Sequence, residues 1–134
     1  MATRWPVLGA ISAGGALGAV GRWALATAWP VHGNGFPWAT FATNVSGCLL
    51  IGVLMVLITE VWVSRPLLRP FLGVGVLGGY TTFSTATVEG ARLLSAGAGW
   101  TGMVYVTATV LAALTAVYLG TVLTRLVIRR RRRA

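Results

Sequence analysis

Long apolar segments separated by short polar turns dominate the hydropathy pattern of this chain. Each segment exceeds the ~20 residues that a helix needs to cross a bilayer, and its apolar positions cover nearly every face rather than one stripe. The pattern predicts four transmembrane helices: Trp5 to Trp29, Pro37 to Val63, Arg69 to Ser95 and Trp100 to Ile128. We therefore expect an all-α membrane protein in which residues 1–134 form a single four-helix domain.

Tryptophan residues mark the expected ends of the first two helices. Trp5 and Trp29 bracket the first, and Trp38 and Trp62 bracket the second. At ~1.5 Å per residue each pair is about 36 Å apart, which suits aromatic belts at the two membrane surfaces. The first apolar segment continues past any signal-peptide cleavage point to Trp29, so we expect it to be retained.

The third apolar segment contains a polar interruption, GGYTTFSTA, at residues 78–86. Glycine costs about 1 kcal/mol relative to alanine in a helix, and hydroxyl side chains compete for the hydrogen bonds of the backbone. Non-helical backbone persists at membrane depth only where protein or water surrounds it. The sequence therefore predicts a third helix that is broken between Gly78 and Phe83, a feature that commonly marks a place where a small ion or substrate binds or crosses.

Charge is concentrated at the C-terminus. The chain carries eleven basic residues, all arginine, and two acidic residues, for a net charge of +9. Five of the arginines fall in the tail at residues 129–134. Because no soluble domain is expected to dock a nucleic acid, we predict that this tail contacts anionic lipid at the bilayer surface and that nucleic acid is not a partner.

The distribution of arginines also predicts an orientation. With four crossings, Arg4, Arg65 and Arg69 lie on the same side as the tail, and the opposite side has only Arg92 near its loop. The positive-inside rule then places both termini in the cytoplasm. The expected location is the inner or plasma membrane of the cell, as a multi-pass protein.

Polar side chains within the predicted helices are the candidates for function. Arg22 either snorkels to the interface or attracts anions to the mouth of a polar path. Asn44 makes an interhelical hydrogen bond or lines that path. Tyr105 and Thr109 form an i, i+4 pair on the fourth helix, although threonine in a helix commonly bonds back to the backbone. Glu89 either accepts hydrogen bonds from hydroxyl or backbone groups or pairs with the nearby arginine on its helix.

These side chains are rich in hydrogen-bond donors and poor in acids, which suits the passage of an anion. The ring of Phe83 adds a positive edge beside hydroxyl groups. The sequence offers few groups for catalysis, because the chain has no paired carboxylates, no Ser-His-Asp set and no His or Cys cluster. Its single cysteine, Cys48, excludes an internal disulfide.

Three segments resemble signatures of the CrcB/Fluc fluoride ion channel family: GGALGAVGRW at residues 14–23, TFATNVSGCLLIG at 40–52 and GGYTTFST at 78–85. The resemblance implies an antiparallel dual-topology-type dimer with two fluoride paths, which exports fluoride passively and so reduces its toxicity. It implies a vestibule position for Arg22 and a fluoride path lined by Asn44, Phe83, Ser84, Thr85, Tyr105 and Thr109. It also implies a structural Na⁺ at the dimer centre, held by the backbone carbonyls of Gly78 and Thr81.

Two departures from the family pattern bear on the dimer. The family motif usually ends TTFSTF, whereas this chain has Ala86 in place of the second ring. The arginine bias also favours one orientation, while an antiparallel homodimer needs both. The expected partner is therefore an oppositely oriented homologous subunit, in a homodimer or a heterodimer. The two departures together favour the heterodimer, in which one pore has lost part of its lining.

Two alternatives remain at this stage. A non-conducting structural subunit of a heterodimeric channel is compatible with Ala86. A small multidrug-type proton-coupled exporter would need an acid in the first helix, where this chain has Arg22.

Overall fold

The computed structural model describes residues 4–62 and 65–133 of the chain. Within these residues the protein is helical and contains no strand, which confirms the all-α fold. In chain order the elements are α1 (Arg4–Ala28), α2 (Trp38–Glu60), η1 (Arg69–Leu77, a π-helix), α3 (Gly78–Tyr80), α4 (Phe83–Ser95) and α5 (Gly99–Arg133). The predicted helix end at Val63 and the last tail residue, Ala134, lie outside the described residues.

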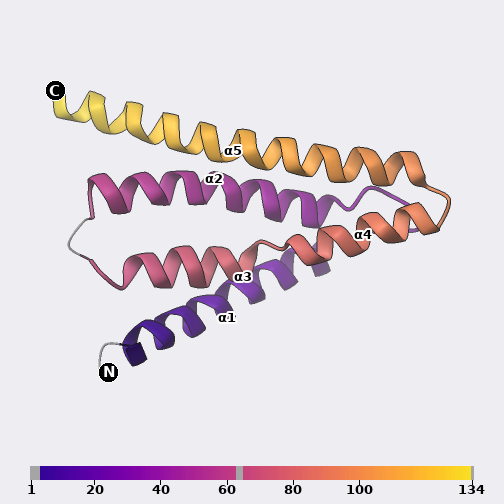
Figure 1. The fold of residues 1–134 in the computed structure, drawn as a ribbon, viewed down its shortest axis with the longest axis horizontal. Helices are drawn as coiled ribbons and strands as arrows, with labels where there is room; N and C mark the ends of the chain where they lie inside the picture. The colour runs from indigo at the N-terminus through magenta and orange to yellow at the C-terminus, as the bar shows by residue number, and fades with distance from the viewer. Residues whose placement is uncertain (1–3, 63–64, 134) are drawn as a thin grey trace.

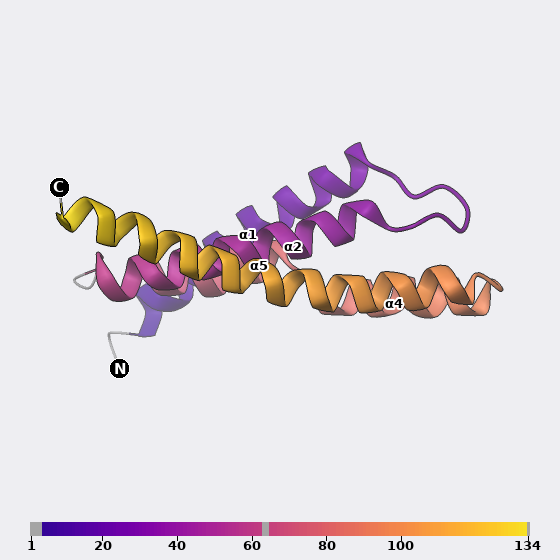
Figure 2. The same ribbon diagram turned by 90° about the horizontal axis from the view of Figure 1, so that it is seen from above.

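Four rods form the molecule, because η1, α3 and α4 follow one another as a single broken rod (Figure 1). The start of α1, the end of α2, the start of η1 and the end of α5 lie at one end of the bundle. The loop between α1 and α2 and the turn between α4 and α5 lie at the other. Figure 2 shows that α1 crosses the other rods obliquely, whereas α4 and α5 run side by side. The main packing pairs are α2 with α5, α1 with η1 and α3, and α4 with α5.

Two helix bounds differ from the sequence pattern. The last helix continues beyond Ile128 through most of the arginine tail to Arg133, where arginines near a helix C-terminus interact favourably with the helix dipole. The break in the third rod is narrower than predicted. Gly78–Tyr80 stays helical, and only Thr81 and Thr82 adopt extended backbone.

Glycine explains why α1 lies so close to the third rod. A Cβ on Gly14 would meet the backbone oxygen of Phe71, and one on Gly18 would meet the backbone oxygen of Val76. On the facing rod, a Cβ on Gly79 would meet the backbone oxygen of Gly15. Small residues allow this backbone contact, which is the usual means of helix association in lipid. Gly79, near the start of the interruption, therefore serves packing against α1 rather than unwinding.

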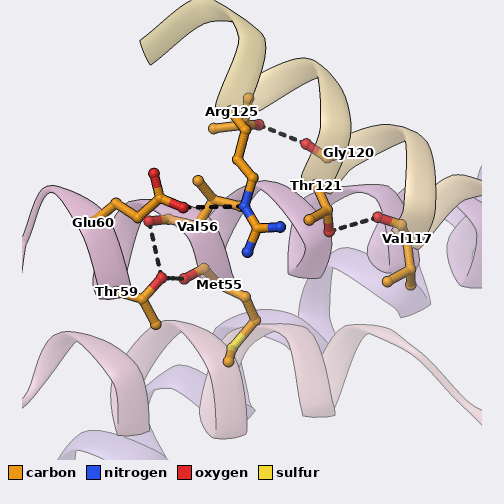
Figure 3. A network of polar contacts seen from close by, with 9 residues as sticks. Met55, Val56, Thr59, Glu60, Val117, Gly120, Thr121 and Arg125 are labelled. Carbon is orange, nitrogen blue, oxygen red and sulfur yellow. Dashed lines mark hydrogen bonds and ion pairs between the residues drawn. The ribbon is translucent and has the colours of Figure 1, made fainter. Parts of the chain in front are cut away.

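An ion pair joins α2 to α5 at the end where the arginines gather. Glu60 Oε1 lies 3.0 Å from Arg125 Nε, with side chains 34% and 52% exposed. Figure 3 shows this pair beside hydroxyl groups that bond back to their own helices, among them Thr59 to Met55 and Thr121 to Val117. Exposed ion pairs of this kind contribute about 0–1 kcal/mol, so this contact adds little to the stability of the packing between α2 and α5.

By length and composition alone, α2 and α5 are the described helices that could cross a membrane. The sequence pattern predicts four spans. The change from π- to α-helix at Gly78 and the break at Thr81 and Thr82 leave elements of 9, 3 and 13 residues in the third rod, each below the 18 residues of such a test. The 25-residue α1 is not among the helices that pass it. Two apolar helices do not by themselves identify a membrane protein.

Candidate functional site

The backbone of the third rod leaves helical geometry at two residues. Thr81 has φ −80° and ψ 157°, and Thr82 has φ −151° and ψ 119°. The Thr82 hydroxyl then begins α4 as its N-cap, accepting a hydrogen bond from the Thr85 amide at 3.1 Å and donating to Thr85 Oγ1 at 2.9 Å. Threonine at an N-cap position satisfies an amide that the helix leaves without a partner. The local sequence therefore restarts the helix immediately after the break.

Asn44 of α2 holds the break from the side. Its Nδ2 donates to the Thr82 carbonyl at 2.9 Å, and its Oδ1 accepts from the Thr82 amide at 2.8 Å. Asn44 is 8% exposed. Its buried side-chain amide therefore satisfies both backbone polar groups of Thr82, the N–H and the carbonyl. The interhelical hydrogen bond that the sequence offers as one role for Asn44 is present, and its partner is backbone.

Arg22 of α1 reaches the break from another direction. Its Nη1 donates to the Thr81 carbonyl at 3.3 Å. The Thr81 hydroxyl donates to the Leu77 carbonyl at 2.9 Å, and its methyl group lies where a Cβ on Gly47 would otherwise sit. Three rods thus converge on two extended residues.

A groove of about 360 Å³ opens beside the break between α4 and α5. Asn44, Phe83, Ala86 and Thr109 are among its lining residues. Phe83 is 83% exposed, whereas Ala86 is 9% exposed. The predicted path residues Asn44, Phe83 and Thr109 therefore meet on one surface. Most of that surface is apolar.

The remaining predicted path residues lie elsewhere. Ser84 and Thr85 are exposed on the first turn of α4 beside the Thr82 hydroxyl. Tyr105 has no exposed surface, and its hydroxyl donates to Glu89 Oε2 at 2.7 Å. The Thr109 hydroxyl bonds back to the Tyr105 carbonyl at 2.7 Å.

Glu89 is the centre of a second polar cluster. Its Oε1 accepts from the Thr40 hydroxyl at 2.9 Å and its other oxygen from Tyr105. An edge-on contact with Phe36, 5.2 Å between ring centroids, covers the tyrosine. A cavity of about 50 Å³ lies beside Glu89 and Arg92, under the loop between α1 and α2. Of the alternatives that the sequence offers for Glu89, hydroxyl groups are its partners.

The break also offers oxygen atoms that could hold a hard cation. In a continuous α-helix the Thr82 amide would bond to the Gly78 carbonyl, but here it donates to Asn44. The Thr85 amide would likewise bond to the Thr81 carbonyl, but it donates to Thr82 Oγ1. Both released carbonyls are the uncharged oxygen donors that suit such a cation. Among the described residues no group of three or more His, Cys, Asp or Glu could hold a metal ion, so backbone oxygens are the ligands that this region can supply.

The sequence did not indicate that Thr82 is the residue held by Asn44 and the N-cap of α4. It also did not indicate that Thr40 donates to Glu89. Thr82 follows two glycines in a run of hydroxyl residues, and nothing local distinguishes its extended backbone from the helical Tyr80. Thr40 precedes Asn44 by one helical turn, which places it on the same face. That spacing could have indicated its contact with the facing rod.

Comparisons with known proteins agree with the three signature segments. The model of the CrcB-like protein, Camphor Resistance (CrcB), family matches residues 9–121. The fluoride-specific ion channel FluC 2 of Nocardia farcinica is 56% identical over 115 residues, which cover 86% of this chain and 82% of the relative. FluC 1 of Streptomyces coelicolor is 51% identical over 118 residues, covering 88% and 77%, and FluC 2 of Thermobifida fusca is 49% identical over 113 residues, covering 84% of each. The chain therefore belongs to the CrcB family, and it is a membrane protein.

Proposed function

We propose that this protein is a fluoride-specific ion channel that lets fluoride leave the cytoplasm passively. The observation that carries the proposal is the break at Thr81 and Thr82, held by Asn44 beside a groove that Phe83 and Thr109 line. Relatives named as fluoride-specific ion channels share the region that contains it. Fluoride enters acidified cells as neutral HF and ionises inside, so a passive path for the anion reduces its toxicity. An ion channel of this kind is not an enzyme.

The groove provides the chemistry for a small anion. The amide of Asn44 and the hydroxyl of Thr109 are polar groups in an otherwise apolar lining, and the exposed ring of Phe83 can turn its positive edge toward an anion. Arg22 would raise the local concentration of anions at the vestibule. Ser84 and Thr85 extend the hydroxyl surface from the break. Tyr105 would contribute through the Glu89 cluster, because its hydroxyl is already donated.

A dimer would complete the groove. Phe83 is 83% exposed in the single chain, and a large ring at a half-built polar site favours a covering partner. We infer an antiparallel arrangement in which the two breaks meet. Most of the exposed arginines belong to segments that meet at one end of the bundle, among them Arg4, Arg69, Arg125 and Arg129, and Arg92 on α4 is the exception. That end would face the cytoplasm and its anionic lipid, so the second subunit is a homologue of opposite orientation.

A Na⁺ ion at the dimer centre would join the two breaks. The Gly78 and Thr81 carbonyls of each subunit would hold it, and it would balance the negative ends of the released peptide dipoles. Four such oxygens from two subunits would suit a hard monovalent cation better than two from one.

The test is fluoride efflux from liposomes, followed with a fluoride electrode. The chain should release fluoride but not chloride when it is reconstituted with its oppositely oriented homologue. Robust efflux from this chain alone would contradict the heterodimer, and absence of efflux under both conditions would contradict the channel. Asn44→Asp should conduct poorly, because a carboxylate cannot donate to the Thr82 carbonyl and repels an anion. Normal conduction in Asn44→Asp would exclude Asn44 from the path.

A second candidate function has a specific observation in its favour. Ala86 is buried in the groove beside Phe83, where the family pattern has a second ring. If this half of the dimer is a non-conducting structural subunit, Ala86→Phe should restore efflux through its pore. If the pore already conducts, the substitution should leave efflux unchanged or reduce it.

A further inference from the structure

The contact between Arg22 and the Thr81 carbonyl is the one charged interaction that the structure shows at the break. Arg22 is half-buried on α1, and its Nη1 lies 3.3 Å from the carbonyl oxygen. The close packing of α1 on the third rod brings it there, because Gly18 lies one turn earlier and leaves no room for a Cβ against Val76 and Tyr80.

The Thr81 carbonyl needs a partner from outside its own rod. The amide that would reach it in a continuous helix, that of Thr85, donates to Thr82 Oγ1. A peptide oxygen without a partner is strongly disfavoured at membrane depth. The guanidinium is always protonated and carries five donors, so it can supply a positive partner at any physiological pH.

The same oxygen is one of the two that the proposed Na⁺ site would use. A cation bound there would face the fixed positive charge of Arg22 within a few ångströms, where screening by water is weak. We propose that Arg22 is a tethered cation for the Thr81 carbonyl: it holds the break when no metal ion is bound, and it competes with Na⁺ for that oxygen. This inference rests on the cation site of the proposed function.

Competition at one oxygen has a reciprocal consequence. If Na⁺ weakens the Arg22 contact, Arg22 weakens Na⁺ binding by the same factor. The wild-type protein should therefore depend little on sodium for its stability. A neutral residue at position 22 should make it depend more on sodium.

The experiment compares wild type, Arg22→Gln, Arg22→Met and Arg22→Lys, each co-purified in detergent with the oppositely oriented homologue so that both halves of the proposed Na⁺ site are present. The midpoint of thermal unfolding is measured as NaCl replaces N-methyl-D-glucamine chloride at constant ionic strength. Arg92→Gln is the matched control, since it removes an exposed arginine that lies away from the break on α4. Glutamine and methionine are both used, so that a folding defect specific to one of them leaves the other to decide.

Arg22→Gln and Arg22→Met should be less stable than wild type without sodium and should recover with it. Their half-saturating Na⁺ concentration should fall by about 5- to 150-fold, the usual range for coupled sites. Arg22→Lys, which keeps the charge, and Arg92→Gln should respond as wild type does.

The inference is overturned if both neutral variants respond to sodium as wild type does, or if they lose stability equally in the two salts. Fluoride efflux from the same preparations is scored separately. A wild type that conducts fluoride while no variant responds to Na⁺ would overturn this inference and leave the channel intact.

Discussion

The third rod and α5 are both long and apolar and both contain several threonines, yet one breaks and the other runs for 35 residues without interruption. In α5 four threonine hydroxyls bond back to their own helix, as Thr115 does to the Leu111 carbonyl at 2.8 Å. Thr81 makes the same bond to Leu77. Thr82 does not, because Asn44 takes its amide and carbonyl and its hydroxyl caps α4. Hydroxyl residues therefore permit a break, but partners on neighbouring helices decide whether one forms.

Glycine, by contrast with threonine, behaves alike in the two rods. In α5, Gly120 faces the backbone of α2 near Leu49 and leaves the helix intact. In the third rod, Gly79 faces α1 equally closely and is also helical. Close packing alone thus breaks neither helix.

Removal of Asn44 should have the largest effect. Asn44→Leu leaves the buried amide and carbonyl of Thr82 without their partners, at a cost of about 1–3 kcal/mol for each group. Fluoride efflux should fall to the background of protein-free liposomes. The free energy of unfolding in detergent measures the first effect and the fluoride electrode the second. Unchanged values for both would mean that Asn44 does not hold the break.

Gly18→Ala should have the second-largest effect, a loss in the free energy of unfolding. The new Cβ would press on the backbone of Val76 and Tyr80, and overpacking of this kind costs about 1–3 kcal/mol. The matched control is Gly9→Ala on the same helix, where a Cβ meets nothing within 4 Å. The same unfolding measurement should show no loss for Gly9→Ala. Equal losses for the two variants would point to glycine itself rather than to the contact.

Thr82→Val should have an intermediate effect. It keeps the shape of the side chain but removes the N-cap of α4, which costs about 0.5–2 kcal/mol. Thr121→Val on α5 removes a hydroxyl that only bonds back to the Val117 carbonyl, so its unfolding free energy should stay near that of wild type. This pair tests directly whether a threonine at the break differs from one in a continuous helix.

The ion pair at the far end of α5 should matter least. A double-mutant cycle with Glu60→Gln and Arg125→Gln should give a coupling energy of about 0–1 kcal/mol, because both side chains are partly exposed. The coupling should diminish in high salt. A value well above this range would show that the pair is shielded from water in the membrane-bound protein.

The sequence predicts the four rods well, because long apolar runs and flanking tryptophans are strong local signals. It also predicts the region of the break, since glycine and hydroxyl residues are concentrated there. The width of the break could not be predicted, because the release of Thr82 depends on Asn44, which lies 38 residues away along the chain. The burial of Tyr105 could not be predicted either, since it depends on Glu89 and on Phe36 from the loop.

The dependence of the break on two other helices has a consequence for biogenesis. Arg22 and Asn44 can contact Thr81 and Thr82 only after α1 and α2 have packed against the third rod. Before then, peptide groups exposed to lipid are satisfied only within a continuous helix. The third rod should therefore enter the membrane unbroken, and the break should form late, as the subunit assembles.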